Sequence, residues 1–462
     1  MHHAIAAFKK ILPASRVLTG ADLADRYSHI WKMDEPLTAL CHLSPETTEQ
    51  LSAVLKICNE HELTVVTHGG LTNLVGSTTS TQNDVVISLE RMDSILEINN
   101  ETRTATVEAG VILEILQDAV KDKGMLFPLN FGAKGSAHIG GIISTNAGGL
   151  RVLKYGMTRN LVLGLEYVLI DGTVVSSLKT IIKDNSGYDL KQLIIGSEGT
   201  LGIITKAVFK LEELPTSRQA AMVGVNEYKN VMRLLKYMDA SLSGKLSGYE
   251  LMWSNAYEQL TSNGAQARPP VPYGFKFYVL IEMQGANDPN NHKDLEAALE
   301  KMLIDEIIED AAIASSPSEV EHFFKIREDV NNITDFMKHD QHFDISIPVP
   351  AIDKYISKSY ESLKLVAGVE QIYAFGHVAD GNIHLMIGKG NTSSELKKEI
   401  DHVVYGGIKE LNGSVSAEHG IGVDKKEYLS LSKTDEEIHL MRIIKKSLDP
   451  KNLLNRGKIF DL

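Results

Sequence analysis

The sequence contains little cysteine, with Cys41 and Cys58 as the only two among 462 residues. Two thiols in apolar surroundings do not form a disulfide framework, and they indicate a reducing compartment. No apolar run is long enough to span a bilayer, and the amino terminus lacks the basic and apolar regions of a secretory signal. We therefore expect no transmembrane segment and predict a cytoplasmic protein.

Basic residues are also in the minority, with 47 Lys and Arg against 60 Asp and Glu, which gives a net charge of −13. Because nucleic acids and anionic membranes are polyanions, this charge disfavours both as partners. A small anionic substrate stays compatible, since a buried site provides its own local field. The hydrophobic content of 43% is that of a globular protein, and 462 residues predict two or three domains.

The sequence lacks the G-x-G-x-x-G spacing of a Rossmann turn, which argues against a nicotinamide cofactor. Three other glycine-rich segments occur in the first half, at residues 68–76, 132–141 and 196–202. Glycine lets backbone N–H groups come close to a pyrophosphate, and it tolerates positive φ. Each segment alone is typical of a structural turn, but three of them in one domain favour a cofactor site.

Apolar spacing in the first half predicts short strands that alternate with helices. We expect a helix capped by Ser44-Pro45-Glu46, a glycine-capped helix over 111–123, strands near 63–66, 84–89 and 104–107, and a hairpin at 161–176.

Pro215 marks a boundary, after which the pattern restarts. The elements expected there are a strand at 220–225, a helix at 227–239, a Gly/Pro-rich loop to Gly274, a strand at 275–282, a helix at 294–308 and a strand–turn–strand unit at 372–387. For residues 216–425 we predict an antiparallel sheet with helices on one face, followed by a helical tail from Lys426.

Two histidines, His377 and His384, flank the turn Asp380-Gly381, which lets both imidazoles converge. Farther along, Glu418 and His419 are adjacent. Two imidazoles and a carboxylate suit a borderline divalent metal that keeps one position open for substrate, and both zinc and manganese use such a set. For an isolated pair among 16 histidines, surface or core positions would be the simpler interpretation.

The glycine-rich segments, together with T-N-A-G-G-L-R at 145–151 and D-N-S-G-Y-D-L at 184–190, resemble the FAD domain of the vanillyl-alcohol-oxidase superfamily. The nearest branch is that of D-2-hydroxyglutarate dehydrogenase, with D-lactate dehydrogenase and the glycolate oxidase FAD subunit as relatives. The resemblance covers nearly the whole chain. It implies an α+β protein in which a two-subdomain FAD-binding domain precedes an α+β cap domain with an antiparallel sheet.

The resemblance implies an FAD-binding domain at 1–215, a substrate or cap domain with a metal site at 216–425, and a helical segment at 426–462 that returns to the FAD domain. The implied FAD contacts lie on the glycine-rich segments, the helix that follows the second segment, and one carboxyl-terminal asparagine. They are His68, Gly69, Gly70, Leu71, Thr72, Asn73, Leu74, Gly135, Ser136, Gly140, Gly141, Ser144, Asn146, Gly199, Gly202, Ile203 and Asn455.

The first glycine-rich segment departs from the family pattern, because Asn73 and Ser77 stand where glycine is usual. Asparagine is the next-best residue for a left-handed backbone position, so we expect the turn to persist. His68 raises the question of a covalent flavin linkage. Since this branch generally holds FAD non-covalently, we expect a turn residue near the cofactor instead.

The resemblance further implies an FAD-dependent dehydrogenase that oxidises a D-2-hydroxy acid to the 2-oxo acid. His377, His384 and Glu418 would bind the metal, with zinc preferred over manganese, and His419 would act as general base. Arg327 would bind the substrate carboxylate. We expect an electron-transfer flavoprotein or a quinone as electron acceptor, rather than NAD, and a possible homodimer.

Three substrate-side positions depart from the D-2-hydroxyglutarate enzymes. His342 replaces a lysine, Asn331 a threonine and Met386 an asparagine. We interpret this as preserved chemistry with a changed substrate. The alternatives are D-2-hydroxyglutarate dehydrogenase proper, a non-catalytic FAD subunit of a glycolate oxidase-like complex, and a metal-free flavoprotein alcohol oxidase.

Overall fold

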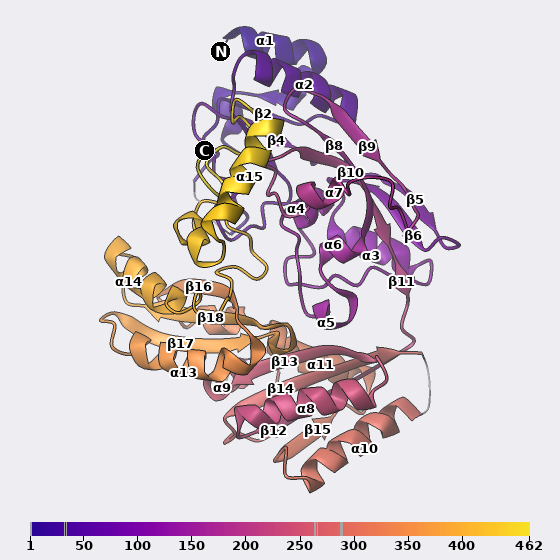
Figure 1. The fold of residues 1–462 in the computed structure, drawn as a ribbon, viewed down its shortest axis with the longest axis vertical. Coiled ribbons are helices and arrows are strands. Elements are labelled where there is room, and N and C mark those ends of the chain that lie inside the picture. Colours follow the sequence, from indigo (N-terminus) through magenta and orange to yellow (C-terminus); the bar gives the residue numbers. More distant parts are fainter. Residues whose placement is uncertain (1, 32, 34, 263–264, 266, 287–289) are drawn as a thin grey trace. The chain divides into compact units, whose positions relative to one another are not determined.

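The computed structural model describes all residues except 1, 32, 34, 263–264, 266 and 287–289. The chain forms two compact units, each described by itself (Figure 1). Unit 1 contains Met1–Gly148, Met157–Leu214 and Glu418–Leu462, and unit 2 contains Gly149–Gly156 and Pro215–Ala417.

This division differs from the expected boundaries in two places. The second boundary falls after Ala417 and not after residue 425, and the segment Gly149–Gly156 belongs to unit 2. Ion pairing explains the second difference. Arg151 donates from Nε and Nη2 to the buried carboxylate of Glu282, both at 3.1 Å, and the flanking helix α5 (Val152–Tyr155) contacts the unit 2 sheet.

Unit 1 contains two sheets. The first has the strand order β1-β2-β4-β3, with β2, β4 and β3 parallel and β1 antiparallel to β2. Its strands are β1 (Val17–Leu18), β2 (Cys41–Leu43), β3 (Val65–His68) and β4 (Val85–Ser88). Helices α1 (His2–Ile11) and α2 (Thr48–Glu60) contribute to the same apolar core, which explains why β2 and β4 are buried along their whole length.

The helix expected from Pro45 begins later, at Thr48. Thr47 is the N-cap residue, because its hydroxyl accepts a hydrogen bond from the backbone N–H of Gln50 at 3.2 Å. Ser44 has another partner, since its hydroxyl donates to Glu90 at 3.1 Å.

The second sheet of unit 1 is antiparallel, with the order β5-β6-β10-β8-β9. Its strands are β5 (Ile95–Asn99), β6 (Thr104–Glu108), β8 (Val162–Val168), β9 (Val174–Ser177) and β10 (Ile203–Lys210), and a small pair is formed by β7 (Met125–Leu126) and β11 (Glu212–Glu213). The helices are α3 (Leu113–Lys121), α4 (Ile139–Ser144), α6 (Thr158–Leu161) and α7 (Lys191–Ile194). The expected hairpin and the glycine at the end of α3, Gly124 with φ +76°, are both present.

The carboxyl-terminal segment belongs to unit 1 and contains η5 (Lys426–Leu431) and α15 (Asp435–Leu448), which is yellow in Figure 1. Beyond α15, Leu454 pairs with Val65 as an isolated parallel bridge at the edge of the first sheet. The backbone N–H of Asn455 donates to the Val65 carbonyl at 2.8 Å, which places the Asn455 side chain next to the first glycine-rich segment.

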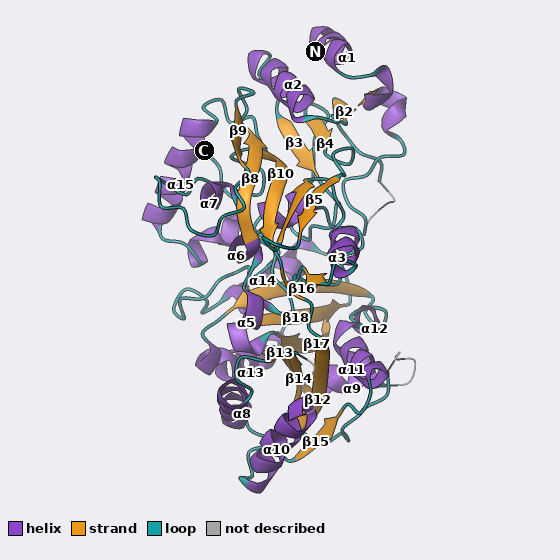
Figure 2. Ribbon diagram, turned by 90° about the vertical axis from the view of Figure 1, so that its right-hand side faces the viewer, coloured by secondary structure: helices purple, strands orange, loops and turns teal. Residues whose placement is uncertain are grey.

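Unit 2 is built on one seven-stranded antiparallel sheet with the order β15-β12-β14-β13-β17-β18-β16 (Figure 2). The strands are β12 (Ser217–Val225), β13 (Leu246–Trp253), β14 (Phe277–Gly285), β15 (Asp310–Ile313), β16 (His339–Ser346), β17 (Val369–Gly376) and β18 (Asn382–Lys389). The longer helices are α8 (Tyr228–Ser241), α9 (Ser254–Thr261), α10 (Asn290–Ile304), α11 (Pro317–Glu328), α13 (Ile352–Leu363) and α14 (Ser394–Tyr405).

Helices pack on both faces of this sheet, so the expectation of helices on one face was wrong. Successive strand residues point to opposite faces. On β14, the centre of the Phe277 ring lies 6.0 Å from that of Tyr228 on α8. The ring of the next residue, Tyr278, stacks on Tyr257 of α9 with 3.7 Å between the ring centres, so α8 and α9 lie on opposite faces.

The loop expected between residue 239 and Gly274 was also wrong, because it contains β13 and α9; residues 263–264 and 266 of it lie outside the described residues. The sequence of β13, L-S-G-Y-E-L-M-W, breaks the apolar pattern of a buried strand with Ser247, Gly248 and Glu250. All three are nevertheless buried, and the carboxylate of Glu250 is compensated by a cation.

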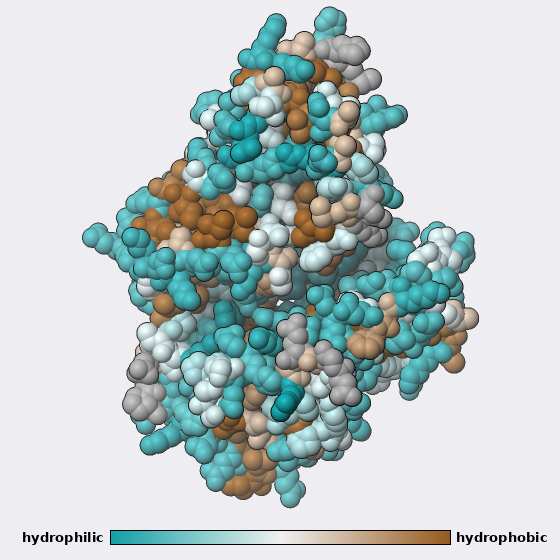
Figure 3. Space-filling model, turned by 180° about the vertical axis from the view of Figure 1, so that it is seen from behind, coloured by the Kyte–Doolittle hydropathy of each residue, from teal (hydrophilic) through white to brown (hydrophobic). Residues whose placement is uncertain are grey.

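The face shown in Figure 3 is mostly hydrophilic, with apolar side chains gathered in separate patches. In unit 1, the segment 181–193 exposes five large apolar side chains: Ile181, Ile182, Tyr188, Leu190 and Leu193. Of the described helices, none has the length and apolar content that a membrane crossing requires.

Candidate functional site

The first two glycine-rich segments meet in unit 1. A Cβ atom on Gly70 would overlap the backbone carbonyl of Ser136, so only glycine fits there. A Cβ on Gly69 would lie 3.6 Å from His138 and 3.7 Å from Gly141. A Cβ on Gly141 itself would meet no atom within 4 Å, which leaves this stretch of backbone open to a ligand.

The third segment and the carboxyl-terminal Asn455 complete the group. The Asn455 side chain accepts from the Thr67 N–H at 3.0 Å and donates to the Glu198 carbonyl at 2.6 Å. The Glu198 N–H in turn donates to the carbonyl of Ser144, at the end of α4, at 2.8 Å. The FAD residues expected from three distant parts of the sequence are therefore linked by hydrogen bonds within one unit.

The first segment keeps its turn in a way that differs from the expectation. The residues of this segment with positive φ are Leu71, with φ +57°, and Gly76, with φ +67°, and not Asn73. Asn73 stabilises the turn through its side chain, which accepts from the Ser77 N–H at 2.9 Å and donates to the Thr78 hydroxyl at 2.6 Å. The Ser77 hydroxyl donates to Glu198 at 3.0 Å.

Other expected FAD residues have visible packing roles. A Cβ on Gly140 would lie 2.9 Å from the Ala109 side chain, and one on Gly202 would lie 3.2 Å from Tyr167, so both glycines permit close packing. Ile203 begins β10, and Asn146 has φ +52°. Thr72, Leu74 and Gly135 lie in loops with intermediate or full exposure.

Buried polar atoms without a protein partner test whether this region fits a cofactor. Among the described residues, they include Thr67 Oγ1, His138 Nδ1 and Ser197 Oγ, one beside or within each glycine-rich segment. Because buried polar groups nearly always have a hydrogen-bond partner, their clustering here indicates a polar ligand. Hydroxyl donors and open glycine backbone suit the phosphates and ribityl chain of FAD.

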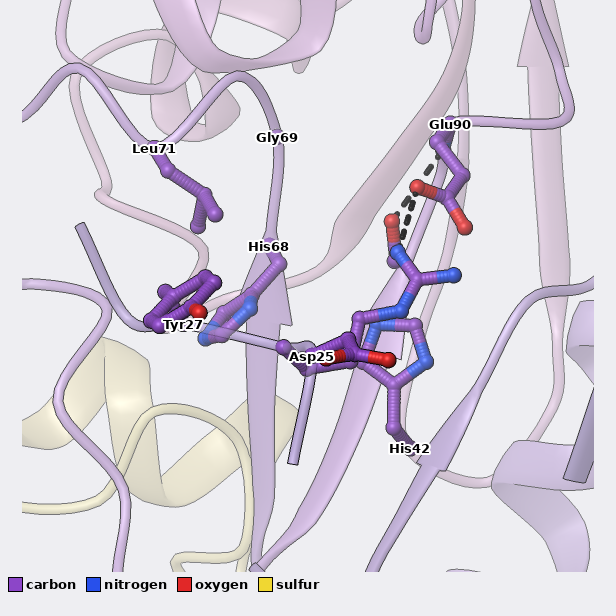
Figure 4. Close-up of a pocket in the computed structure, with 9 residues that line it drawn as sticks. Asp25, Tyr27, His42, His68, Gly69, Leu71 and Glu90 are labelled. Atoms are coloured by element: carbon purple, nitrogen blue, oxygen red, sulfur yellow. Dashed lines mark hydrogen bonds and ion pairs between the residues drawn. The ribbon is translucent and has the colours of Figure 1, made fainter. Parts of the chain in front are cut away.

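A pocket adjoins the first segment (Figure 4). It is lined by Asp25, Arg26, Tyr27, His42, His68, Gly69, Leu71, Ser88 and Glu90. His68 Nε2 is hydrogen-bonded to the Thr78 carbonyl at 2.9 Å, and burial lowers the pKa of His68 to about 4. The ring is therefore neutral at neutral pH, with one nitrogen engaged by the turn, as expected for a turn residue.

In unit 2, a buried carboxylate joins two of the expected site residues. The Arg327 Nε–H donates to Glu250 Oε2 at 2.8 Å, and His377 Nδ1 lies 2.6 Å from Glu250 Oε1. Burial alone would raise the pKa of Glu250, but His377 and Arg327 hold it below its usual value, so the carboxylate is ionised. Glu250 was missed in the sequence because β13 was interpreted as a loop.

The two expected histidine ligands are close together. The ring centroids of His377 and His384 lie 5.4 Å apart, since His377 follows β17 and His384 lies on the neighbouring β18. Asp344 on β16 is the register partner of His384. Its carboxylate accepts from the Ala417 N–H at 3.1 Å, so the segment that leads to Glu418 starts beside it.

A possible metal-binding group consists of Asp344, His384, Glu418 and His419, within the part of the chain that the structure describes. It differs from the expected set in that it includes Asp344 and His419 and does not include His377. Asp344 accepts a hydrogen bond from the N–H of Ala417, and Glu418 is the next residue. Adjacent α-carbons are about 3.8 Å apart, so the Glu418 backbone lies close to this hydrogen bond. A carboxylate and an imidazole on facing strand positions fit a divalent ion.

Two expected substrate residues are neighbours on the sheet, because His342 on β16 is the register partner of Met386 on β18. Met386 is buried, whereas the His342 side chain is partly exposed and its Nε2 lies 2.5 Å from Asp340 Oδ2. The hydrogen bond from His342 lowers the pKa of Asp340. Asn331 is exposed at the start of the short helix α12 (Asn331–Thr334).

Comparison with solved structures shows the fold of the chain. The chain superposes on p-cresol methylhydroxylase with a TM-score of 0.74 and 16% sequence identity, covering 100% of this chain and 97% of that one. Alkyldihydroxyacetonephosphate synthase gives a TM-score of 0.74 and 14% identity over 98% of this chain and 84% of that one. The predicted fold class is confirmed.

Family comparisons cover both halves of the sequence. Residues 214–459 match the family described as FAD linked oxidases, C-terminal domain, and residues 39–177 match the FAD binding domain. The chain belongs to the FAD-linked oxidase family, as the sequence resemblance implied. It is thus a flavoprotein oxidoreductase by family.

Curated relatives extend over nearly the whole chain. "Probable D-2-hydroxyglutarate dehydrogenase, mitochondrial" from Oryza sativa subsp. japonica is 39% identical and covers 98% of this chain and 81% of that protein. The zebrafish (Danio rerio) D-2-hydroxyglutarate dehydrogenase, mitochondrial, is 35% identical over 98% of this chain and 84% of its own length. D-2-hydroxyglutarate dehydrogenase from Stutzerimonas stutzeri is 32% identical and covers 98% and 97%.

These relatives overturn one expectation. We predicted a cytoplasmic protein from the two cysteines and the apparent lack of a signal sequence. Several of the relatives are named as mitochondrial proteins, including those from rice and zebrafish, and this contradicts the prediction.

We predict that Gly70→Ala lowers the amount of FAD bound per chain, because the added Cβ overlaps the Ser136 carbonyl and the two loops must separate. Overpacking of this kind costs about 1–3 kcal/mol. The measurement is the FAD released from purified protein on denaturation. Gly132→Ala is the control, since a Cβ there meets nothing within 4 Å. Equal FAD content in the two variants would show that this loop contact does not support the cofactor.

Proposed function

We propose that this protein is an FAD-dependent dehydrogenase that oxidises a D-2-hydroxy acid to the 2-oxo acid with help from a divalent metal. The observation that supports it most is the array Arg327–Glu250–His377, with His384 and Asp344 beside it, within unit 2. The names of the relatives support the substrate class.

The side chains suggest a division of roles. When bound, FAD supplies the acceptor for the hydride from the substrate Cα, and a divalent metal supplies the Lewis acid that lowers the pKa of the substrate hydroxyl. Arg327 would bind the substrate carboxylate, because its Nε–H is engaged by Glu250 and the Nη groups are not hydrogen-bonded within the described chain. His419 would take the hydroxyl proton as general base.

The metal would be held by His377, His384 and Glu418, with Asp344 as a further candidate ligand. Zinc fits an imidazole and carboxylate set best, and manganese is the alternative. A non-catalytic FAD subunit is the less favoured function, because such a subunit has no need of a histidine and carboxylate cluster beside a buried arginine. An electron-transfer flavoprotein or a quinone would accept the electrons.

For the substrate itself we propose a D-2-hydroxy monocarboxylate, lactate-like or with an apolar side chain. His342 lies 2.5 Å from the Asp340 carboxylate, and it lacks the full, permanent point charge of a lysine, so this position attracts a second substrate carboxylate less than a lysine would. The neighbouring Met386 adds an apolar wall. D-2-hydroxyglutarate is the alternative, favoured by the names of the relatives.

His384→Ala should abolish turnover and lower bound metal while FAD stays, because the imidazole would be one of the metal ligands.

His419→Asn should also remove turnover, by roughly a hundred- to ten-thousand-fold, but with metal and FAD retained, since it removes only a base. Metal analysis and steady-state rates check both. His292→Ala, at an exposed position on α10, is the control.

Two results would contradict this assignment. Full activity after exhaustive chelation would show that the reaction needs no metal. Loss of metal from His419→Asn would make His419 a ligand and not the base, as its place in the possible metal-binding group allows.

His342→Lys should raise kcat/KM for D-2-hydroxyglutarate and D-malate relative to D-lactate and D-2-hydroxybutyrate, because a permanent positive charge replaces the imidazole beside Asp340. His339→Lys is the matched control, because His339 lies on the same strand with its side chain on the opposite face. A wild-type preference for D-2-hydroxyglutarate at neutral pH, unchanged by His342→Lys, would refute the monocarboxylate proposal.

A further inference from the structure

Glu250 is placed where an unpaired carboxylate would be strongly unfavourable. It lies in the middle of β13, a central strand of the seven-stranded sheet, and its side chain is 2% exposed. Strand register explains its partners. Leu251 pairs with Gly376, the last residue of β17, so the next residue along the chain, His377, lies opposite Glu250.

The two oxygens of Glu250 serve different residues. Oε2 accepts from the Arg327 Nε–H at 2.8 Å, and Oε1 lies 2.6 Å from His377 Nδ1. An ionised carboxylate only accepts hydrogen bonds, so His377 Nδ1 must carry the proton. In the neutral ring the lone pair then resides on Nε2, which is the nitrogen through which this histidine would bind a metal.

Arg327 is held in place by a second contact. Its guanidinium carbon lies 4.7 Å from the centre of the Phe375 ring. The centre of that ring lies 5.5 Å from the centre of the His384 ring. Glu250 on one side and Phe375 on the other therefore fix the direction of the guanidinium. The same carboxylate thus fixes the direction of the Arg327 guanidinium, which would bind substrate, and the tautomer of His377, which would bind metal.

We propose that Glu250 is the positioning residue of this site, which couples the substrate-binding Arg327 to the metal-binding His377 through one carboxylate. This inference rests on the proposed function, because it assigns Glu250 a purpose only if the metal and the substrate carboxylate bind here. Outer carboxylates that fix a metal-binding histidine typically contribute a factor of about 10–100 in metal affinity.

Replacement by glutamine separates the two contacts. The amide of Glu250→Gln has one oxygen acceptor, which satisfies the Arg327 Nε–H, and one NH₂ group, which donates. An NH₂ group that faces His377 Nδ1 favours the tautomer with the proton on Nε2. That tautomer has no lone pair on Nε2 and does not bind a metal through it.

Glu282 offers a matched control. It is also a glutamate with a 1% exposed side chain, on the neighbouring strand β14, and it is paired with Arg151 and Arg218. Its register partner is Gly248, two residues before Glu250, so both glutamates face the same side of the sheet. Glu282→Gln therefore removes a buried, paired carboxylate without touching His377 or Arg327.

The experiment measures zinc affinity by chelator competition on FAD-loaded wild type, Glu250→Gln, Glu250→Asp and Glu282→Gln. We expect Glu250→Gln to weaken zinc binding about 10–100-fold and Glu282→Gln to leave it unchanged. Glu250→Asp, which keeps two acceptor oxygens on a shorter side chain, should give an intermediate affinity. At saturating zinc, Glu250→Gln should also show a raised KM for the hydroxy acid, because the neutral amide keeps the hydrogen bond to Arg327 Nε–H but loses the ionic attraction that strengthens it.

The outcomes separate this inference from the proposed function. A wild-type protein without stoichiometric metal would overturn the proposed function, and this inference with it. A metal-binding wild type with equal zinc affinity and KM in Glu250→Gln and Glu282→Gln would overturn the positioning role alone. If Glu250→Gln does not fold, the comparison of Glu250→Asp with wild type decides, and unchanged zinc affinity there counts against the role.

Discussion

A carboxylate in the interior of a sheet must be paired, and this constraint on Glu250 organises unit 2. Removing one partner of a buried ion pair typically costs about 3–5 kcal/mol, because a charge is left without compensation. Arg327 at the end of α11 and His377 at the end of β17 therefore have to meet at β13. The positions of α11, of the turn after β17 and of His384 on β18 are all consistent with this single pairing.

Unit 1 is constrained by backbone approach and not by charge. Glycine at position 70 allows the first loop to contact Ser136, and Asn455 bonds to Thr67 and Glu198 on either side. The same region keeps Thr67 Oγ1, His138 Nδ1 and Ser197 Oγ buried without protein partners. Buried polar atoms without partners lower the stability of the protein alone, and a ligand that binds them stabilises the folded state. We therefore expect FAD content and stability to change together.

The sequence predicted those features that are local. The hairpin of β8 and β9, the glycine-capped helix α3 and the convergence of His377 and His384 around a turn follow from short-range patterns. It did not predict β13, because Glu250 interrupts the apolar pattern of a buried strand. Asp344 was missed because its role depends on the register that places it opposite His384, and Asp340 because its pairing with His342 requires that residues 339–346 form a strand. The left-handed Leu71 was missed because an apolar residue rarely adopts that conformation.

The claim on which the account depends is that a D-2-hydroxy acid delivers a hydride to the bound flavin. The most direct measurement is anaerobic titration of the purified, FAD-loaded, metal-replete protein with D- and L-2-hydroxy acids while the flavin absorbance is followed. We predict stoichiometric bleaching by at least one D-2-hydroxy acid, and none by its L-enantiomer. A flavin that dithionite reduces but that no D-2-hydroxy acid bleaches would contradict the account.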